Sequence, residues 1–315
     1  MRFFQSVFFI LGSTLIFFAS CKKVETTRIN TTGNSQTQTI ISSDELTLND
    51  EFDQGVDDAI AVLCNPKITI AGADIDTSQN NIGLITIYYS GKKPDGTKGR
   101  TGSIAIQQPM KGGKPVPWGT PGTTDSIIFG TVNSPGYEIL FITNNTSVRM
   151  TGTATITNVS GGLLQNITPV DSLVERIRAS ISFTYNDNVS IIQLYSWYLN
   201  QIRTFTKPDT IMYARTNADT TINNIKNVAT WGTTRFGEVF YSSLTSPVVQ
   251  NISNLSLSYN PLSGAKAIEN ISEPILSTYG VNKQGAAISN GLPFGFLITW
   301  INNGGQAQAI VPYYY

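Results

Sequence analysis

The chain has 315 residues, of which 13% are charged, and its 21 lysines and arginines balance 21 aspartates and glutamates. It contains no histidine, which excludes Ser-His-Asp and Cys-His catalysis, imidazole metal sites and histidine-based pH switches. The even charge balance, with its densest basic cluster in a glycine-rich turn, excludes nucleic acid as an expected partner.

The first twenty residues have the pattern of an export signal. Arg2 is followed by an apolar run from Val7 to Ala19, which has the length of a signal-peptide core and is too short for a membrane-spanning helix. The run ends in Phe18-Ala19-Ser20-Cys21, which resembles the lipobox of bacterial lipoproteins, although Phe18 stands where leucine is commoner. We therefore expect cleavage before Cys21 and a membrane anchor of acyl chains on Cys21, because several such chains hold a protein firmly to a bilayer.

Polar residues follow the predicted anchor. Lys22, rather than aspartate, comes directly after Cys21, which by resemblance to Gram-negative sorting signals favours the outer membrane. The next residues are not clearly acidic, so they leave both the periplasmic and the extracellular face open. Segment 21–43 is rich in Thr, Ser, Asn and Gln and has little apolar surface to bury, which predicts a flexible tether.

A helix is predicted after this tether. Apolar residues recur at steps of three and four from Phe52 to Cys64, with Asn49 or Asp50 available to cap the start and Asn65-Pro66 to end it. Cys64 lies on the apolar stripe, where we expect it to pack as a small hydrophobic residue. The opposite face, which we expect to be solvated and which could alternatively bind a cation, carries Asp53, Gln54, Asp57 and Asp58.

After Pro66 the apolar pattern changes from helical to alternating. Short runs rich in Ile, Val, Thr, Tyr and Phe are separated by Gly- and Pro-rich turns such as 111–122, and one short helix is predicted at 171–178. Because strands and helices do not alternate, the predicted class is all-β, antiparallel and sandwich-like, with one short N-terminal helix. The predicted strands are 67–75, 82–90, 100–108, 126–132, 137–143, 147–159, 179–185, 189–203, 211–215, 235–241, 254–259, 294–300 and 306–314.

These predictions divide the chain into four parts. Residues 1–20 form the signal peptide and residues 21–43 the flexible polar tether. An N-terminal β unit with its leading helix follows at 44–168, and a C-terminal β unit at 169–315. The two β units could also form one continuous domain.

Several strand and turn motifs resemble those of one class of protein. Asp95-Gly96 is followed by Arg100-Thr-Gly-Ser-Ile-Ala-Ile106 and by Gly-Thr-Ala-Thr-Ile-Thr-Asn at 152–158. Together with Arg235 to Pro247 and Tyr279-Gly280, these motifs resemble uncharacterised Bacteroidetes-type lipoproteins. Such proteins often keep cysteines in their C-terminal half, and this chain has none there. The resemblance implies a β-rich, lipid-anchored envelope protein and supplies no catalytic residues.

Four tripeptides resemble the acceptor of general protein O-glycosylation in Bacteroides-like bacteria, in which aspartate precedes the modified serine or threonine. Sugar at these positions would make the surface bulkier and more soluble. The alternative is that Asp-Ser and Asp-Thr are ordinary turn starts before strands. The candidate acceptors are Ser126, Ser172, Thr210 and Thr220.

Motifs for catalysis or cofactor binding are missing from the sequence. It has no Walker loop and no dinucleotide fingerprint, and two Ser-x-x-Lys matches lack the companion motifs of penicillin-binding enzymes. We therefore predict no catalytic residues, no metal and no cofactor, and we lean against an enzyme.

Three classes of function stay open. The first is a non-catalytic envelope lipoprotein that binds or displays a glycan or protein partner, with Trp118 in its Pro/Gly loop as the candidate ligand platform. Trp197, Trp231 and Trp300 lie within or beside strand patterns, where we expect them to pack in the core. The second is a glycoside hydrolase with two carboxylates about 5 to 9.5 Å apart in a groove. The third is a purely structural envelope protein.

Overall fold

The computed structural model describes residues 35–92, 98–130, 136–141, 146–186, 193–253, 256–257, 260–289, 291–302 and 304–313. In these ranges one α-helix, α1 (Ser35–Cys64), precedes a 17-stranded antiparallel sheet, which confirms the predicted all-β class with a helix near the N-terminus. The strands of the sheet are β1 (Ala73–Asp76), β2 (Leu84–Lys92), β3 (Lys98–Gln107), β6 (Thr123–Phe129), β7 (Tyr137–Phe141), β8 (Thr146–Asn158), β9 (Ser172–Asn186), β10 (Gln193–Thr206), β11 (Met212–Asn217), β12 (Thr220–Ile222), β13 (Ile225–Thr233), β14 (Val239–Ser253), β15 (Ser256–Leu257), β16 (Ser263–Glu269), β17 (Ile275–Val281), β18 (Gly295–Asn302) and β19 (Gly305–Pro312). Outside the sheet lie the hairpin of β4 (Met110–Lys111) and β5 (Lys114–Pro115) and the 3-10 helices η1 (Asn80–Ile82) and η2 (Leu164–Asn166).

The sheet follows the chain closely from one edge to the other. β1, β2 and β3 pair in sequence, and β3 then pairs with both β6 and β7, which both pair with β8. β8, β9 and β10 form the long central strands, and β10 leads through β11 and β13 to β14. β16 to β19 complete the order. Because β8 pairs with β9 across residue 168, the two predicted β units contribute to one continuous sheet.

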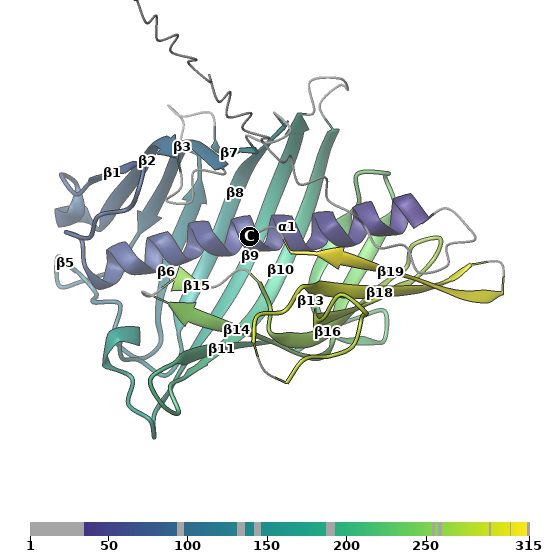
Figure 1. Ribbon diagram of the computed structural model, residues 1–315. Coiled ribbons are helices and arrows are strands. Elements are labelled where there is room, and N and C mark those ends of the chain that lie inside the picture. Colours follow the sequence, from purple (N-terminus) through teal and green to yellow (C-terminus); the bar gives the residue numbers. More distant parts are fainter. Residues whose placement is uncertain are drawn as a thin grey trace, which may run out of the picture.

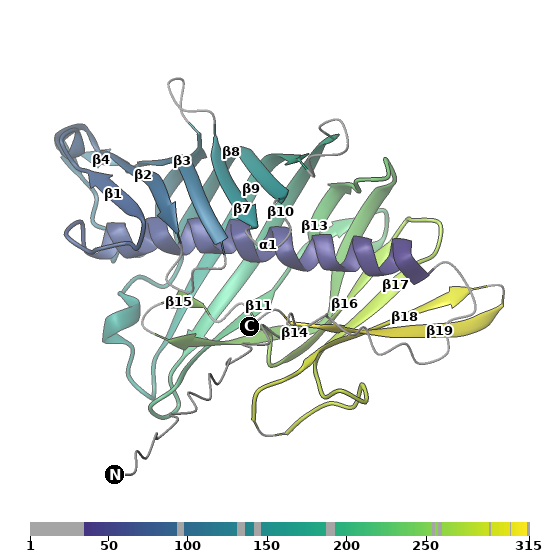
Figure 2. The same cartoon turned by 45° about the horizontal axis from the view of Figure 1, so that its top comes forward.

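The sheet curls around α1. In Figures 1 and 2, β8 to β10 lie on one side of the helix and β14 to β19 on the other. Glycines permit neighbouring strands to approach closely on this curved surface. Gly102 has φ +87°, and a Cβ there would lie 1.6 Å from the carbonyl oxygen of Gly136. Gly152 has φ +134°, and a Cβ there would lie 2.2 Å from the carbonyl oxygen of Ser180. Only glycine fits such positions.

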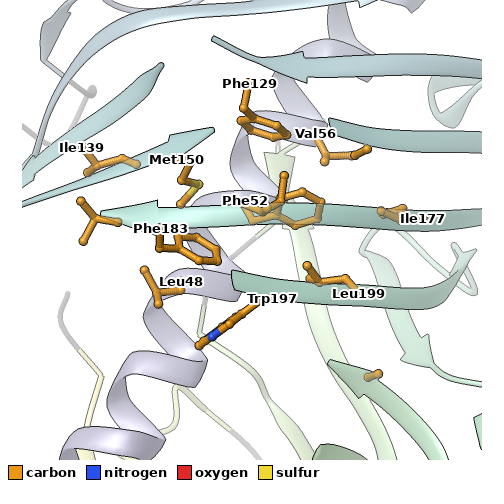
Figure 3. Packing of buried hydrophobic residues seen from close by; sticks show 14 of the residues in the cluster. Leu48, Phe52, Val56, Phe129, Ile139, Met150, Ile177, Phe183, Trp197 and Leu199 are labelled. Carbon is orange, nitrogen blue, oxygen red and sulfur yellow. The ribbon is translucent and has the colours of Figure 1, made fainter. Parts of the chain in front are cut away.

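The apolar stripe of α1 packs against the inner face of the sheet. Figure 3 shows Leu48, Phe52 and Val56 facing side chains from β6, β9 and β10. The rings of Phe52 and Phe129 are 5.4 Å apart, and Phe183 meets Trp197 edge-on at 5.1 Å. Each fully buried side chain of this kind contributes about 1.5–3 kcal/mol. This packing places the main core between the helix and the sheet.

The polar side of α1 is enclosed as well, which corrects the prediction of a solvated face. Arg203 of β10 is fully buried and contacts Asp53 at 2.5 Å and Asp57 at 2.9 Å, while Asp58 contacts Arg100 of β3 at 2.7 Å. The curled sheet surrounds the helix, so these carboxylates meet cations on the strands in place of water. Three further acids of α1 pair in the same way: Asp44 with Arg235, Glu45 with Lys266 and Glu51 with Lys98.

Local boundaries also differ from the predictions. The helix begins at Ser35, so residues 35–43 of the predicted tether are helical, and neither Asn49 nor Asp50 is a cap. The predicted end is confirmed, because α1 stops at Cys64, just before Asn65-Pro66. The predicted helix at 171–178 is wrong, since 172–178 is the first half of β9, whose side chains alternate between the core and the outer face. Strands β13 at 225–233, β16 at 263–269 and β17 at 275–281 were not predicted.

Candidate functional site

Strand β10 presents alternate side chains to the two sides of the sheet. Tyr195, Trp197 and Leu199 point into the core and are almost fully buried. Tyr198 lies in the opposite phase and is 45% exposed on the outer face. Period-two alternation dictates this arrangement, because successive side chains of a strand point to opposite faces.

Tyr198 forms a stacked pair with Trp231. The two residues are directly opposite each other on β10 and β13, and their rings are 5.7 Å apart with an interplanar angle of 19°. On β14, Tyr241 is the next residue in the same cross-strand row. Cross-strand aromatic pairs stabilise a sheet, yet this one faces outward and keeps part of its ring surface accessible.

The pair borders a shallow hollow of about 310 Å³, which we call the outer hollow. It is lined by residues of β8, β9, β10 and β13. No carboxylate is among its lining residues in the part of the chain that the structure describes. They are Thr153, Ala154, Thr155, Arg178, Ala179, Ser180, Tyr198, Leu199, Asn200 and Trp231.

Two arginines on the outer face of β9 have different surroundings. Arg176 binds both carboxylate oxygens of Asp219, with N–O distances of 3.0 and 2.7 Å. The same carboxylate accepts a hydrogen bond from Asn200, and its pKa is lowered by the hydrogen bond from Arg176. Arg178 lines the outer hollow and has no ion pair or hydrogen bond with any residue that the structure describes. Among the described residues that line the hollow, Arg178 is therefore the one cation, and it is unpaired.

Trp118, the predicted ligand platform, lies elsewhere and is 2% exposed, so that prediction is wrong. Its Pro/Gly loop folds back over the end of β8, where the backbone NH of Gly162 donates to the carbonyl of Gly119 and Asn158 donates to the carbonyl of Trp118. These bonds draw the indole into the core. Trp197 and Trp300 are buried as predicted, whereas Trp231 is on the outer face.

The candidate modification sites are spread over the molecule. Cys21 lies outside the described residues. Ser172 and Thr210 are exposed, Ser126 and Thr220 are half-buried, and Asn200 donates a hydrogen bond to the hydroxyl of Thr220. Asp125, which precedes Ser126, is fully buried. An enzyme that reads the aspartate with its neighbour can therefore reach Ser172 and Thr210 more easily than Ser126.

Carboxyl groups gather in the interior and not in the outer hollow. Burial raises the pKa of Asp57 to about 7 and of Glu175 to about 8, although nearby Arg203 opposes both shifts. Burial also raises the pKa of Asp125 to about 7. Such values suit acid–base chemistry, but a glycoside hydrolase requires two carboxyl groups across a groove. Asp57 borders a cavity of only about 20 Å³, and it is the one carboxyl group among the described residues that line it. Among the described residues, no group of three or more potential ligands is placed to hold a metal ion.

Cys64 is half-buried at the end of α1, against the core. Burial raises the pKa of its thiol to about 12, with nearby Glu175 adding to the shift. A thiol with this pKa is protonated at neutral pH and is a poor nucleophile. The prediction that Cys64 packs as a small hydrophobic residue agrees with this placement.

Comparison with known protein families, with curated proteins and with solved structures finds no match. Of the helices in the described part of the chain, none combines the length and the apolar character needed to cross a bilayer. Sequence reasoning overlooked Tyr198 and Arg178, although the alternation of β10 and β9 would have placed both in the outward phase, and it wrongly assigned Trp231 to the core.

Proposed function

We propose that this protein is a lipid-anchored envelope lipoprotein that binds saccharides through the outer hollow, without catalysis. The observation that carries the proposal is the stacked Tyr198–Trp231 pair on the outer face beside a hollow of about 310 Å³. Small-ligand sites begin at about this volume and combine apolar walls with a few polar groups. The apolar C–H face of a sugar ring suits an accessible aromatic ring, which offers a large rigid surface at little cost in side-chain entropy.

Polar groups around the pair complement sugar hydroxyls. The lining offers the hydroxyls of Thr153, Thr155 and Ser180, each of which can donate and accept a hydrogen bond. The three residues project from β8 and β9, whose pairing fixes their spacing: Thr153 is opposite Ser180, and Thr155 is opposite Arg178. A site built on paired strands is rigid, so a bound ring loses little affinity to reordering of the protein.

Anchoring at Cys21 is supported by the apolar run from Val7 to Ala19 and by the small residues before the cysteine. Intact-mass measurement of protein from its native membrane should give an acylated chain that begins at Cys21. The same spectrum tests O-glycosylation, which we expect first at exposed Ser172 and Thr210. An unacylated chain with a different start would contradict the anchor and leave saccharide binding as a separate question.

Saccharide binding is tested by screening the mature, membrane-extracted protein on an array of neutral and acidic glycans. Trp231→Ala should weaken binding to every glycan recognised by about tenfold or more, which corresponds to about 1.4 kcal/mol of lost stacking. Tyr88→Ala is the matched control, because Tyr88 is an exposed aromatic residue of β2 outside the hollow. Urea unfolding of each variant checks that the fold is intact. Equal binding by the wild type and Trp231→Ala would contradict the proposal.

A further inference from the structure

Resting on the proposed saccharide site, we infer that its ligand is acidic: a sugar whose ring carries a carboxylate or sulfate group that binds Arg178. The charge of the hollow favours an anion. Among the described residues that line the outer hollow, Arg178 is the one charged side chain, and no carboxylate stands beside it to neutralise the guanidinium. A bound anion would supply the missing counter-charge.

Asp219, which could have paired with Arg178, already binds Arg176. Asp219 lies on the same side of β9 and β10 and is held by three hydrogen bonds, two from Arg176 and one from Asn200. Asn200 in turn is directly opposite Arg178 on the neighbouring strand. The arrangement therefore holds Asp219 on Arg176 and leaves Arg178 free to bind an incoming anion.

The register sets Arg178 at a useful distance from the aromatic pair. Arg178 is opposite Asn200, and Ser180 is opposite Tyr198, so Arg178 and Tyr198 are diagonal neighbours across β9 and β10. Diagonal neighbours in an antiparallel sheet are about 7–8 Å apart. A sugar ring stacked on the aromatic pair thus brings a ring substituent within reach of the long Arg178 side chain.

Arginine suits this task because its planar guanidinium can donate two parallel hydrogen bonds to one carboxylate or sulfate. The contact would lie at the rim of an open hollow, where water and salt screen it. We therefore expect it to contribute selectivity between acidic and neutral sugars, with stacking on Trp231 supplying the shared part of the affinity.

The test uses two pairs of polysaccharides that differ only in charge: a uronic acid polymer with its carboxyl-reduced form, and a sulfated galactan with its desulfated form. The wild type should bind at least one charged member about fivefold or more tightly than its neutral partner, and the difference should shrink as salt increases. Arg178→Gln should abolish the difference while keeping the neutral affinity. Arg215→Gln, which changes an exposed arginine outside the hollow, should leave it unchanged.

The outcomes separate the two proposals. Equal affinity for charged and neutral members, or a preference that survives Arg178→Gln, overturns the acidic ligand and leaves saccharide binding standing if Trp231→Ala still weakens it. Failure of the wild type to bind any polymer overturns both. A preference for the carboxylated pair alone, or for the sulfated pair alone, supports the inference and identifies the anionic group.

Discussion

Asp125 is the clearest single residue at which the fold carries an electrostatic cost. Its side chain is fully buried on β6, and neither carboxylate oxygen has a hydrogen-bond partner among the described residues. Burial raises its pKa from 3.8 to about 7. Between these values the folded protein keeps a proton that the unfolded chain has lost, so this group makes stability fall as pH rises from about 4 to about 7.

We predict that Asp125→Asn stabilises the protein at pH 8 and has little effect at pH 4. Asparagine cannot ionise, so the substitution removes the cost of the raised pKa, which is about 1.4 kcal/mol per pH unit, while it keeps a buried polar group at this position. The gain at pH 8 should therefore be about 1–4 kcal/mol. Urea unfolding at the two pH values measures it. Asp209→Asn, at an exposed position, should change neither value. A loss of stability at pH 8 would show that Asp125 makes a contact that favours its charged form.

The burial of α1 depends on charged partners that belong to distant strands. Arg203 is fully buried between Asp53 and Asp57, with Glu175 lowering the cost of its burial from a third side. The pKa of Arg203 is raised further above its usual range by these acids, although burial alone would lower it. Removing one member of a buried ion cluster leaves uncompensated charge, which costs more than the cluster itself contributes.

We predict that Arg203→Gln lowers the free energy of unfolding by about 3–5 kcal/mol, the usual range for a broken buried pair. Adding Asp57→Asn to that variant should restore part of the loss, because one unpaired carboxylate is removed. The matched control is Arg176→Gln on the outer face, where the partly exposed Arg176–Asp219 pair contributes about 1 kcal/mol or less. Equal losses for Arg203→Gln and Arg176→Gln would contradict a structural role for the buried cluster.

The helix also shows what the sequence could and could not predict. The spacing from Phe52 to Cys64 and the stop at Pro66 follow from local chemistry, and both were predictable. The burial of Asp53 was not, because it depends on Arg203, which is 150 residues later in the chain. Local sequence patterns predict the periodicity of an element. They predict a solvated position for any charged face, because the distant residues of opposite charge that bury it are not part of the local pattern.

At the scale of the whole molecule, the interior carboxyl groups act together. Burial raises the pKa values of Asp57, Asp125 and Glu175 to about 7, 7 and 8. Burial also raises the pKa values of Asp44, Asp50 and Asp53. The chain has no histidine, and the pKa of Cys64 is raised to about 12, so in the described structure buried carboxyl groups dominate side-chain titration between pH 5 and pH 9. The pKa values of Asp76 and Asp219 are lowered, so they affect stability only in more acidic solution.

We predict that the free energy of unfolding decreases from pH 5 to pH 9. Each carboxyl is protonated in the folded protein and ionised in the unfolded chain over part of this range, so stability is lost as pH rises toward the folded-state pKa values of about 7 and 8 and levels off above them. Unfolding by urea at constant ionic strength measures the slope. A stability that is constant or rises over this range would mean that the arginines hold the carboxyls ionised in the folded state.

The candidate site was less predictable than the fold class. Alternation in β10 places Tyr198 on the outer face, but Trp231 belongs to a strand that was not predicted, and its position opposite Tyr198 depends on pairing between distant segments. Trp118 lies in a Pro/Gly loop that resembles an exposed turn, and its burial follows from Asn158 on β8. Exposure of a side chain is a property of tertiary packing, which loop composition describes poorly.

Enclosure of α1 has a consequence for the order in which the molecule is assembled. Gln38, Asp44 and Glu45 of the helix contact Glu273, Arg235 and Lys266, which lie 191 to 235 residues later in the chain. Contacts of such long sequence separation form slowly, because loop closure precedes any gain from them. The helix is synthesised long before these partners, so a growing chain cannot complete its burial. Completion of the native core therefore requires the C-terminal strands. The core of a nearly finished chain stays incompletely packed until the last hairpins are synthesised.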